Sequence, residues 1–315
     1  MKILGLPLRS GRVFQAMCKD SIFIFNYHEV NANPSLFTRK YRLNVPPELF
    51  SQQLKWIKQY FNVISPVQLI ENKFDLPAAL ITFDDGFAST FEIAAPILRS
   101  NNIPAVVFMN MAPVEGKIFW PGLTTYLCYY DKAFPEYMLK RHNKSGHTLF
   151  LYCRQEEVDE YVSRNNARKI YDDARAYYGT FANLNHLRAS SDYGLFLGNH
   201  LYNHYNAAIL TPEDLKDSYI TNENKLRKYS NNINCFSYPF GQPQTCYNAQ
   251  TDRVIFSMGA KRVFTAYASQ NRDPHSKRLH RLSMHDNLKD EQSFKNHVVM
   301  PSLLHKFFRK KYTYI

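Results

Sequence analysis

The sequence contains no apolar run that approaches the roughly 20 residues needed for a membrane-spanning helix. Its only early apolar stretch, residues 22–25, is too short for the hydrophobic region of a signal peptide, and residues 1–20 show no clear cleavage pattern. Internal repeats and low-complexity segments are also missing. We therefore expect a soluble chain without an ordinary export signal, located in the cytoplasm.

Cysteine is scarce and irregularly placed. The chain has five cysteines, and no two of them form a Cys-x-x-Cys pair: Cys18, Cys128, Cys153, Cys235 and Cys246. An odd, scattered set does not fit a disulfide framework. We interpret these residues as free thiols.

Acidic residues are outnumbered, because 39 Lys and Arg against 27 Asp and Glu leave a net charge of +12. Strongly basic surfaces attract nucleic acid or anionic membranes. Residues 305–315 mix cations with aromatic side chains, a composition suited to a bilayer interface. We expect peripheral association of this basic C-terminal tail with the inner face of an anionic membrane, and no nucleic-acid partner. The alternative is a solvated basic tail.

Hydrophobic residues, by contrast, are plentiful, at 45% of 315 residues, which is ample for a packed core. Residues 80–86 read Leu-Ile-Thr-Phe-Asp-Asp-Gly, a short buried strand that ends in two carboxylates. Such strand ends are where α/β folds keep their chemistry. Successive side chains of a strand point to opposite sides, so Asp84 and Asp85 can take different roles. The alternative is an ordinary polar turn.

Two histidines, His200 and His204, stand four residues apart. At that spacing they would lie on one face of a helical turn, close enough for one metal ion to bind both imidazoles. Divalent transition metals favour imidazole nitrogen with carboxylate oxygen, so two histidines and one aspartate would form a site with positions left for water and substrate. With eleven histidines in the chain, a chance pair is the alternative.

Residues 235–241 read Cys-Phe-Ser-Tyr-Pro-Phe-Gly, a strand that stops at a proline and is followed by a turn. A backbone N–H exposed after such a turn, near Phe240, can face a developing oxyanion. The alternative is a plain strand end.

The three segments occur in the order of one family, and the chain resembles the polysaccharide deacetylases of the NodB-homology type (carbohydrate esterase family four). The Thr-Phe/Tyr-Asp-Asp motif stands at residues 82–85. The His-Ser/Thr-x-x-His motif stands at residues 200–204, with Leu201 in place of the hydroxyl residue, and the third motif at residues 237–241 lacks its arginine. The resemblance covers roughly residues 21–285 and implies an α/β fold, a distorted (β/α)7-type barrel with a helical insertion.

One subgroup of this family, similar to the poly-N-acetylglucosamine deacetylases, has a Tyr-His motif on the first strand. Residues 21–30 fit that pattern, with Tyr27 and His28 at the end of an apolar strand. His28 would then lie at the same edge as Asp84, and we expect it to be the general acid. His280 is the competing candidate, because many members have a catalytic histidine near the C-terminal end of the domain.

The resemblance also implies a mechanism. Asp85, His200 and His204 would hold a divalent metal, with zinc as the expected ion, which would polarise the amide carbonyl and lower the pKa of a bound water. Asp84 would take the proton from that water as general base. His28, as imidazolium, would protonate the departing amine.

Substrate contacts are expected from the third motif and from the insertion. The predicted residues are Tyr238, Pro239, Phe240 and Trp120, and Trp120 would stack on sugar rings. A buried core position is the alternative for Trp120. The arginine missing from the third motif leaves Asp84 without a cation, and Arg281 is a candidate to replace it.

Strand and helix signals alternate along the chain as in a βα barrel. The pattern predicts helices over residues 47–60 and 88–99 and a strand over residues 103–109. The predicted organisation is an N-terminal extension at 1–20, a deacetylase domain at 21–290 with a helical lid or substrate wall at about 120–190, and a tail at 291–315.

The leading hypothesis is a metal-dependent deacetylase that removes N-acetyl groups from an amino-sugar-containing polysaccharide, oligosaccharide or glycolipid. A hydrolase of another amide or ureide on the same barrel is the second hypothesis. A catalytically silent saccharide-binding module is the third, and the four intact residues of the first two motifs argue against it.

Overall fold

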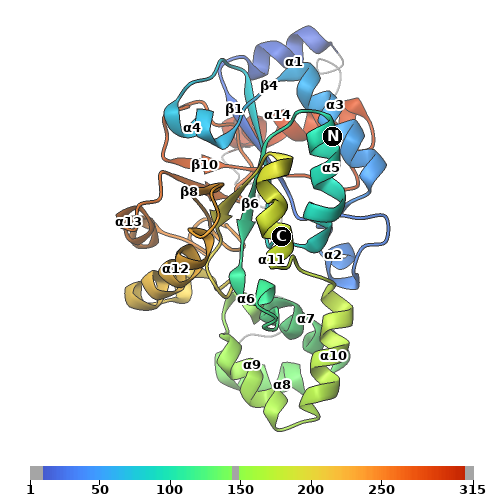
Figure 1. Cartoon of the computed structure of the whole chain (residues 1–315), viewed down its shortest axis with the longest axis vertical. Coiled ribbons are helices and arrows are strands. Elements are labelled where there is room, and N and C mark those ends of the chain that lie inside the picture. The colour runs from blue at the N-terminus through green and yellow to red at the C-terminus, as the bar shows by residue number, and fades with distance from the viewer. Residues whose placement is uncertain (1–9, 144–148, 309–315) are drawn as a thin grey trace.

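The computed structural model describes residues 10–143 and 149–308, and it is built around a sheet of parallel strands (Figure 1). The order is β10-β9-β8-β7-β6-β5-β1-β11, and β4 pairs with β5 at the start of that strand. The strands are β1 (Ile22–Tyr27), β4 (Asn62–Val63), β5 (Ala78–Phe83), β6 (Ala105–Met109), β7 (Leu195–Asn199), β8 (Asn232–Ser237), β9 (Arg262–Thr265), β10 (Arg278–His280) and β11 (Leu282–Ser283).

The two edges of the sheet are joined by one short segment. Strand β10 pairs with β9 at one edge, and β11 pairs with β1 at the other. Arg281 alone separates β10 from β11 in the sequence, so the chain crosses the gap at this residue. The sheet is therefore a nearly closed, distorted barrel, as the sequence predicted.

The barrel strands bury alternate side chains on two sides. Phe23 and Phe25 of β1 pack with the outer helices, whereas Ile22 and Ile24 face the interior. The same alternation in β5 sends Leu80 inward. Every residue of β1, β5 and β6 is buried, as expected for parallel strands covered on both faces.

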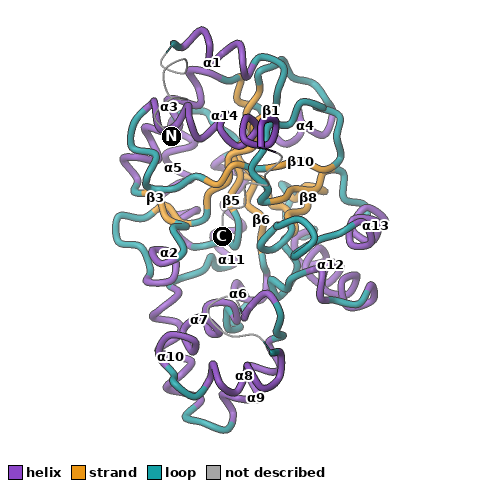
Figure 2. Tube along the Cα trace, turned by 180° about the vertical axis from the view of Figure 1, so that it is seen from behind, coloured by secondary structure: helices purple, strands orange, loops and turns teal. Residues whose placement is uncertain are grey.

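Helices surround the strands, and a separate group of helices lies at one end (Figure 2). The predicted helix over residues 47–60 is confirmed, and so is the one predicted over 88–99, which contains a π-helical turn. Around the barrel lie α1 (Gly11–Cys18), α2 (Leu36–Lys40), α3 (Pro47–Tyr60), α4 (Pro66–Glu71), η2 (Thr90–Ala94), α5 (Ala95–Ser100), α6 (Met111–Val114), η4 (Ser190–Tyr193), η5 (Ala207–Ile209), α12 (Pro212–Leu226), α13 (Ala249–Ser257) and α14 (Glu291–Phe308).

The helices between β6 and β7 have a hydrophobic core of their own. This core includes Trp120, Leu127 and Phe134, and Phe37 of α2 packs into it from the barrel side. The elements are α7 (Trp120–Tyr130), α8 (Phe134–His142), η3 (Leu149–Leu151), α9 (Gln155–Ser163) and α10 (Ala167–Tyr178). The next helix, α11 (Leu184–Ala189), packs through Leu187 into the main core instead, and a small ladder of β2 (Glu29–Val30) and β3 (Asn44–Val45) lies beside α2.

Both ends of the described chain pack against the barrel. Phe14 of α1 is fully buried against Tyr60, and Phe294 and Val298 of α14 belong to the main core. The start of the predicted tail is thus a core helix rather than an appendage. The side chains of residues 304–315 lie outside the described part, as does the basic segment expected to meet a membrane. No helix in the described ranges is both long and apolar enough to cross a bilayer.

Candidate active site and metal centre

Asp84 continues the interior-facing series of β5, beyond Leu80 and Thr82. Its carboxylate receives two hydrogen bonds from Arg281, at 2.7 and 2.6 Å, and one from Asn26 at 3.2 Å. Arg281 is 1% exposed and also donates to the Ser237 hydroxyl at 2.8 Å. Because the barrel closes at Arg281, its guanidinium supplies the cation that the arginine missing from the third motif would have provided to Asp84. This is the role that the sequence suggested for Arg281.

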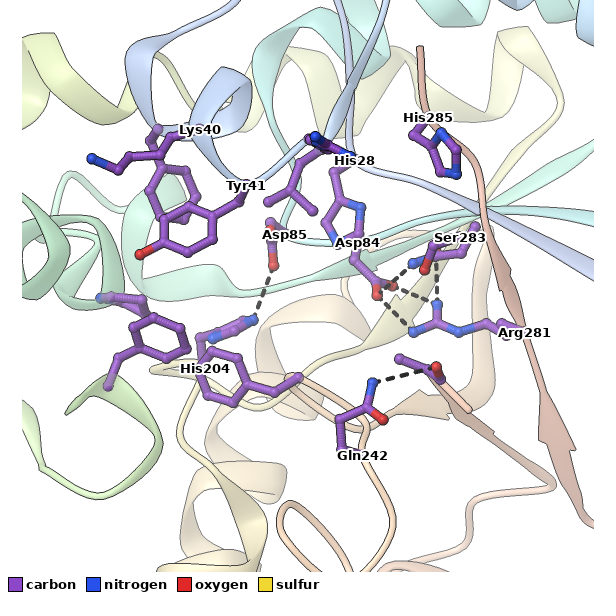
Figure 3. Close-up of a pocket in the computed structure, with 18 of the residues that line it drawn as sticks. His28, Lys40, Tyr41, Asp84, Asp85, His204, Gln242, Arg281, Ser283 and His285 are labelled. Atoms are coloured by element: carbon purple, nitrogen blue, oxygen red, sulfur yellow. Dashed lines mark hydrogen bonds and ion pairs between the residues drawn. The ribbon is translucent and has the colours of Figure 1, made fainter. Parts of the chain in front are cut away.

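Asp85 faces the other way, towards His204 (Figure 3) and His200. Its Oδ1 lies 3.5 Å from His200 Nε2 and 3.1 Å from His204 Nε2, and all three side chains are buried. One ligand atom from each lies within 4.8 Å of the others. Asp85 has a φ of 71°, a left-handed conformation that costs a non-glycine residue free energy and is typical of functional sites.

The histidines lie in a loop after β7, not on a helical turn as predicted. Leu201 and His204 both have positive φ, at 59° and 55°, which is incompatible with a regular helix. The loop bends so that both imidazoles reach Asp85, although they do not share a helix face. The four-residue spacing therefore pointed to the two histidines that meet Asp85, although these residues do not lie on the helical turn from which the prediction was argued.

Buried asparagines hold this loop in place. Asn110 donates to the carbonyl oxygens of His200 and Leu201, at 2.5 and 2.9 Å. Asn199 accepts from the Leu201 N–H at 3.0 Å and receives a 2.9 Å hydrogen bond from Asn222. These amides satisfy the polar backbone of an irregular buried segment, which would otherwise be costly.

The donor set fits a divalent metal. His200 Nδ1 lies 2.7 Å from the Ser237 carbonyl oxygen, an arrangement that leaves Nε2 available as a ligand. Asp85 Oδ1 is buried and has no well-formed hydrogen bond within the described residues. An orphaned carboxylate oxygen between two imidazole nitrogens is the environment that a bound cation would satisfy.

The protonation states also suit a metal. Burial would raise the pKa of Asp85, but the adjacent His204 and His200 outweigh it and hold the pKa well below its usual value. Burial lowers the pKa of His204 despite the opposing charge of Asp85. An ionised carboxylate and a neutral imidazole are the forms that bind metal.

Asp84 is ionised for a different reason. Burial would raise its pKa, but the charge of Arg281 and its hydrogen bonds dominate and lower the pKa. The two carboxylates are thus both anionic: Asp84 pairs with a guanidinium, whereas Asp85 faces the two imidazoles with which it would share a metal ion.

His28 reaches the same cavity from the end of β1, whereas His280 does not line it. Burial lowers the pKa of His28, while Asp85 and Asp84 oppose that effect. The hydroxyl of Thr90, in the π-helical turn, donates to the His28 carbonyl at 3.2 Å and holds this end of the strand. His280 instead lies 3.0 Å from the Thr265 hydroxyl.

The predicted substrate contacts need correction. Trp120 is 1% exposed, and its indole N–H donates to the Asn203 carbonyl oxygen at 2.5 Å. Tyr238 is fully buried and its hydroxyl bonds Asp252, and Pro239 is buried as well. Of the four residues, only Phe240 lines the cavity. The aromatic rings of Trp120 and Tyr238 are core groups, because each has its polar atom satisfied inside the fold.

The turn after the third motif has an unusual backbone. Phe240 and Gly241 have φ values of 60° and 62°, and a Cβ on Gly241 would lie 2.4 Å from the Ala266 nitrogen. Glycine is therefore required at that position. Within the described residues the Phe240 N–H has no hydrogen-bond acceptor, so it remains available to a ligand oxygen.

A cavity of about 1070 Å³ connects these groups. The insertion contributes Phe119 and Tyr129, so it forms a wall of the cavity. Sequence reasoning missed a further wall, in which α14 presents residues at helical spacing: Ser293, Asn296, His297 and Met300. It also missed Lys40, Arg42 and His285. The four α14 positions share a helical spacing, but Ser, Asn, His and Met have no common chemistry that marks a cavity wall in the sequence.

Fold and site together define a parallel α/β barrel with a carboxylate–imidazole cluster at the C-terminal ends of its strands. The polysaccharide deacetylase family model matches residues 71–263, so the chain belongs to that family. The matched range contains Asp84, Asp85 and both loop histidines, whereas His28 and Arg281 lie outside it.

Solved structures share the fold. The Streptococcus pyogenes deacetylase PplD in complex with acetate is 18% identical, with a TM-score of 0.57 over 86% of this chain and 96% of that one. IcaB from Ammonifex degensii is 17% identical, with a TM-score of 0.57 over 88% and 97%. A de-N-acetylase from Aggregatibacter actinomycetemcomitans is 15% identical, with a TM-score of 0.57 over 88% and 99%. No curated protein matches the sequence.

Proposed function

We propose that the protein is a metal-dependent deacetylase that hydrolyses N-acetyl groups of an amino-sugar-containing polysaccharide, oligosaccharide or glycolipid. The observation that carries this proposal is the buried cluster of Asp85, His200 and His204, next to Asp84 at a large cavity, in a chain of the polysaccharide deacetylase family. A structural neighbour is itself a deacetylase in complex with acetate, the product that such a reaction releases.

Asp85, His200 and His204 would hold the divalent cation, and zinc suits this mixture of ligands. Bound there, the cation would polarise the amide carbonyl and lower the pKa of water. Three protein ligands, one after β5 and two in the loop after β7, leave room on the cavity side for substrate. The Ser237 carbonyl oxygen can only accept a hydrogen bond, so His200 Nδ1 is the donor and Nε2 is the nitrogen that faces the metal position.

The remaining chemistry consists of proton transfers by residues of the chain. Asp84 accepts the proton of the attacking water, and Arg281 keeps that carboxylate ionised and oriented. The Phe240 N–H faces the developing oxyanion. His28 donates a proton to the departing amine nitrogen as the carbon–nitrogen bond breaks. Hydrolysis then yields acetate and a free amino sugar.

The position of His28 supports a more specific proposal about the general acid. Its place at the end of β1, in the cavity shared with Asp84 and Asp85, agrees with the Tyr-His subgroup to which the sequence is similar. We therefore propose that the general acid comes from the first strand, as in enzymes resembling the poly-N-acetylglucosamine deacetylases.

The test combines metal analysis of the purified protein with acetate release from N-acetylglucosamine oligomers. We expect one divalent ion per chain and measurable acetate. Asp85→Ala should lose metal and activity together, whereas Asp84→Asn should keep the metal and lose turnover. A protein that binds no divalent metal, or that loses nothing on Asp85→Ala, would overturn the proposal. Ring opening of a cyclic amide without acetate release would favour the ureide alternative.

A further inference from the structure

The cavity carries more positive charge than the proposed reaction uses. Among the residues that the structure describes, two carboxylates line it: Asp84, which pairs with Arg281, and Asp85, which belongs to the metal-binding cluster. Lys40 and Arg42 line the same cavity. Neither of them forms an ion pair in the part of the chain that the structure describes.

These two cations lie on a turn with a defined conformation. Lys40 ends α2, and Arg42 follows in the left-handed region with a φ of 53°. The Leu43 N–H donates to the Thr38 carbonyl at 2.8 Å and closes the turn. The buried carboxylate of Glu29 accepts hydrogen bonds from the Thr38 hydroxyl and from the backbone at the start of α2, so the turn is anchored to β2.

Aromatic rings accompany the cations. The Lys40 ammonium lies 2.8 Å from the centre of the Tyr129 ring, which the insertion contributes to the cavity wall. Tyr41 lies between the two cations in sequence and also lines the cavity (Figure 3). An aromatic face beside a cation suits a sugar ring that bears a negative group, because the ring packs on the tyrosine and the anion meets the charge.

Arg42 also acts on a neighbouring group of the cavity. Burial lowers the pKa of His285, which lines the same cavity; Asp286 opposes this effect, and the charge of Arg42 lowers the pKa further. The net charge of +12 would also steer polyanions towards the molecule.

We infer that Lys40 and Arg42 form an anion subsite, so the preferred substrate is an N-acetylated saccharide that carries a phosphate or a carboxylate near the reacting sugar. The inference rests on the proposed deacetylase function and specifies its substrate class. A neutral glycan would leave two cations of the cavity without a counter-charge. An anionic one would pair them, most strongly at low ionic strength, because Lys40 and Arg42 are exposed and salt screens exposed charges.

The test compares three saccharides that share the N-acetylglucosamine unit. Neutral N-acetylglucosamine oligomers serve as reference, oligomers alternating with glucuronate supply a carboxylate, and a nucleotide diphosphate derivative supplies phosphate. Dissociation constants are measured with metal-loaded Asp84→Asn protein, and kcat/KM with the unmodified chain. We expect at least one anionic probe to bind about tenfold more tightly than the neutral one, and the difference to shrink at high salt.

The variant Lys40→Met/Arg42→Met should abolish this preference, so that the ratio of anionic to neutral affinity falls towards one. The matched control is Lys228→Met/Arg253→Met, which removes two exposed cations that do not line the cavity, and it should keep the ratio. Equal binding of all three probes, or equal loss of preference in both double variants, would overturn the subsite. Metal loss or absent acetate release would instead count against the deacetylase function itself, so the two failures are distinguishable.

Discussion

Asp84 and Asp85 are adjacent in sequence but belong to different environments, because the end of a strand directs them to opposite sides. Asp84 meets a guanidinium inside the barrel, and Asp85 meets two imidazoles. The difference in role between the two carboxylates follows from their partners, since both are buried and both are ionised. Single substitutions at such positions therefore have separable effects.

The general acid can be assigned by comparing two histidines. His28→Ala should lower kcat for acetate release by roughly 10²–10⁴-fold and leave metal content intact, because a positioned acid contributes about that factor. His280→Ala is the matched control and should have a much smaller effect, since His280 lies outside the cavity lining. A slower His280 variant would move the acid to the C-terminal candidate.

Arg281 controls both the stability and the pH dependence of Asp84. In Arg281→Met the buried carboxylate loses its cation, which should cost about 3–5 kcal/mol of unfolding free energy. Any folded enzyme should have a higher Asp84 pKa, so the acidic limb of its pH–rate profile should move to higher pH. Denaturant titration and pH–rate profiles measure these effects. The double variant with Asp84→Asn should recover part of the stability, and no recovery would contradict the pairing.

At the scale of elements, the metal site depends on a loop rather than on a helix. Leu201 is buried against Leu215 and Tyr219, where the family motif has a hydroxyl residue. The asparagine network of Asn110, Asn199 and Asn222 supplies the polar contacts that shape the loop. Tertiary hydrogen bonds from other elements thus hold the backbone of His200 and Leu201 at the start of the loop.

Removal of one amide from this network should loosen the metal site. Asn110→Ala leaves the carbonyls of His200 and Leu201 unpaired, at a cost of about 1–3 kcal/mol. We expect the metal dissociation constant to rise by at least about tenfold, as measured by competition with a chelating dye. Asn271→Ala is the matched control, because Asn271 also donates to two carbonyls but lies at β1 and β10. Equal metal affinity in both variants would make the network purely structural.

At the scale of the whole molecule, α14 links the core to the cavity. One side of the helix buries Phe294 and Val298, and another presents Asn296 and His297 to the cavity. A segment that looked like a tail is therefore part of both the fold and the candidate substrate wall.

His297 should make folding sensitive to acid. Burial, with a smaller contribution from His285, lowers the pKa of His297 from 6.5 to about 3. The unfolded chain therefore binds a proton between these pH values and the folded chain does not, so stability should fall as pH drops below about 6.5, by up to a few kcal/mol. Denaturant titrations at several pH values test this. His297→Gln should flatten the slope, whereas exposed His275→Gln should not.

Local sequence patterns were sufficient to predict several secondary-structure elements, the residues of the metal site and the fold class. The hydrophobic strand before Asp84 and Asp85, the helix over residues 47–60, the histidine pair and the barrel class all depend on short-range periodicity and motif order, which a linear chain displays directly. The free thiols agree with that analysis, since all five cysteines are unpaired.

Other features required the folded chain, because they depend on contacts between distant segments. Arg281 reaches Asp84 only because the barrel closes at that residue, and Trp120 is buried only because the insertion packs around it. The left-handed loop at His204, the cavity wall from α14 and the cations at Lys40 and Arg42 have no local signature. The sequence determines which side chains are present and in what order, whereas tertiary packing determines which of these side chains come into contact.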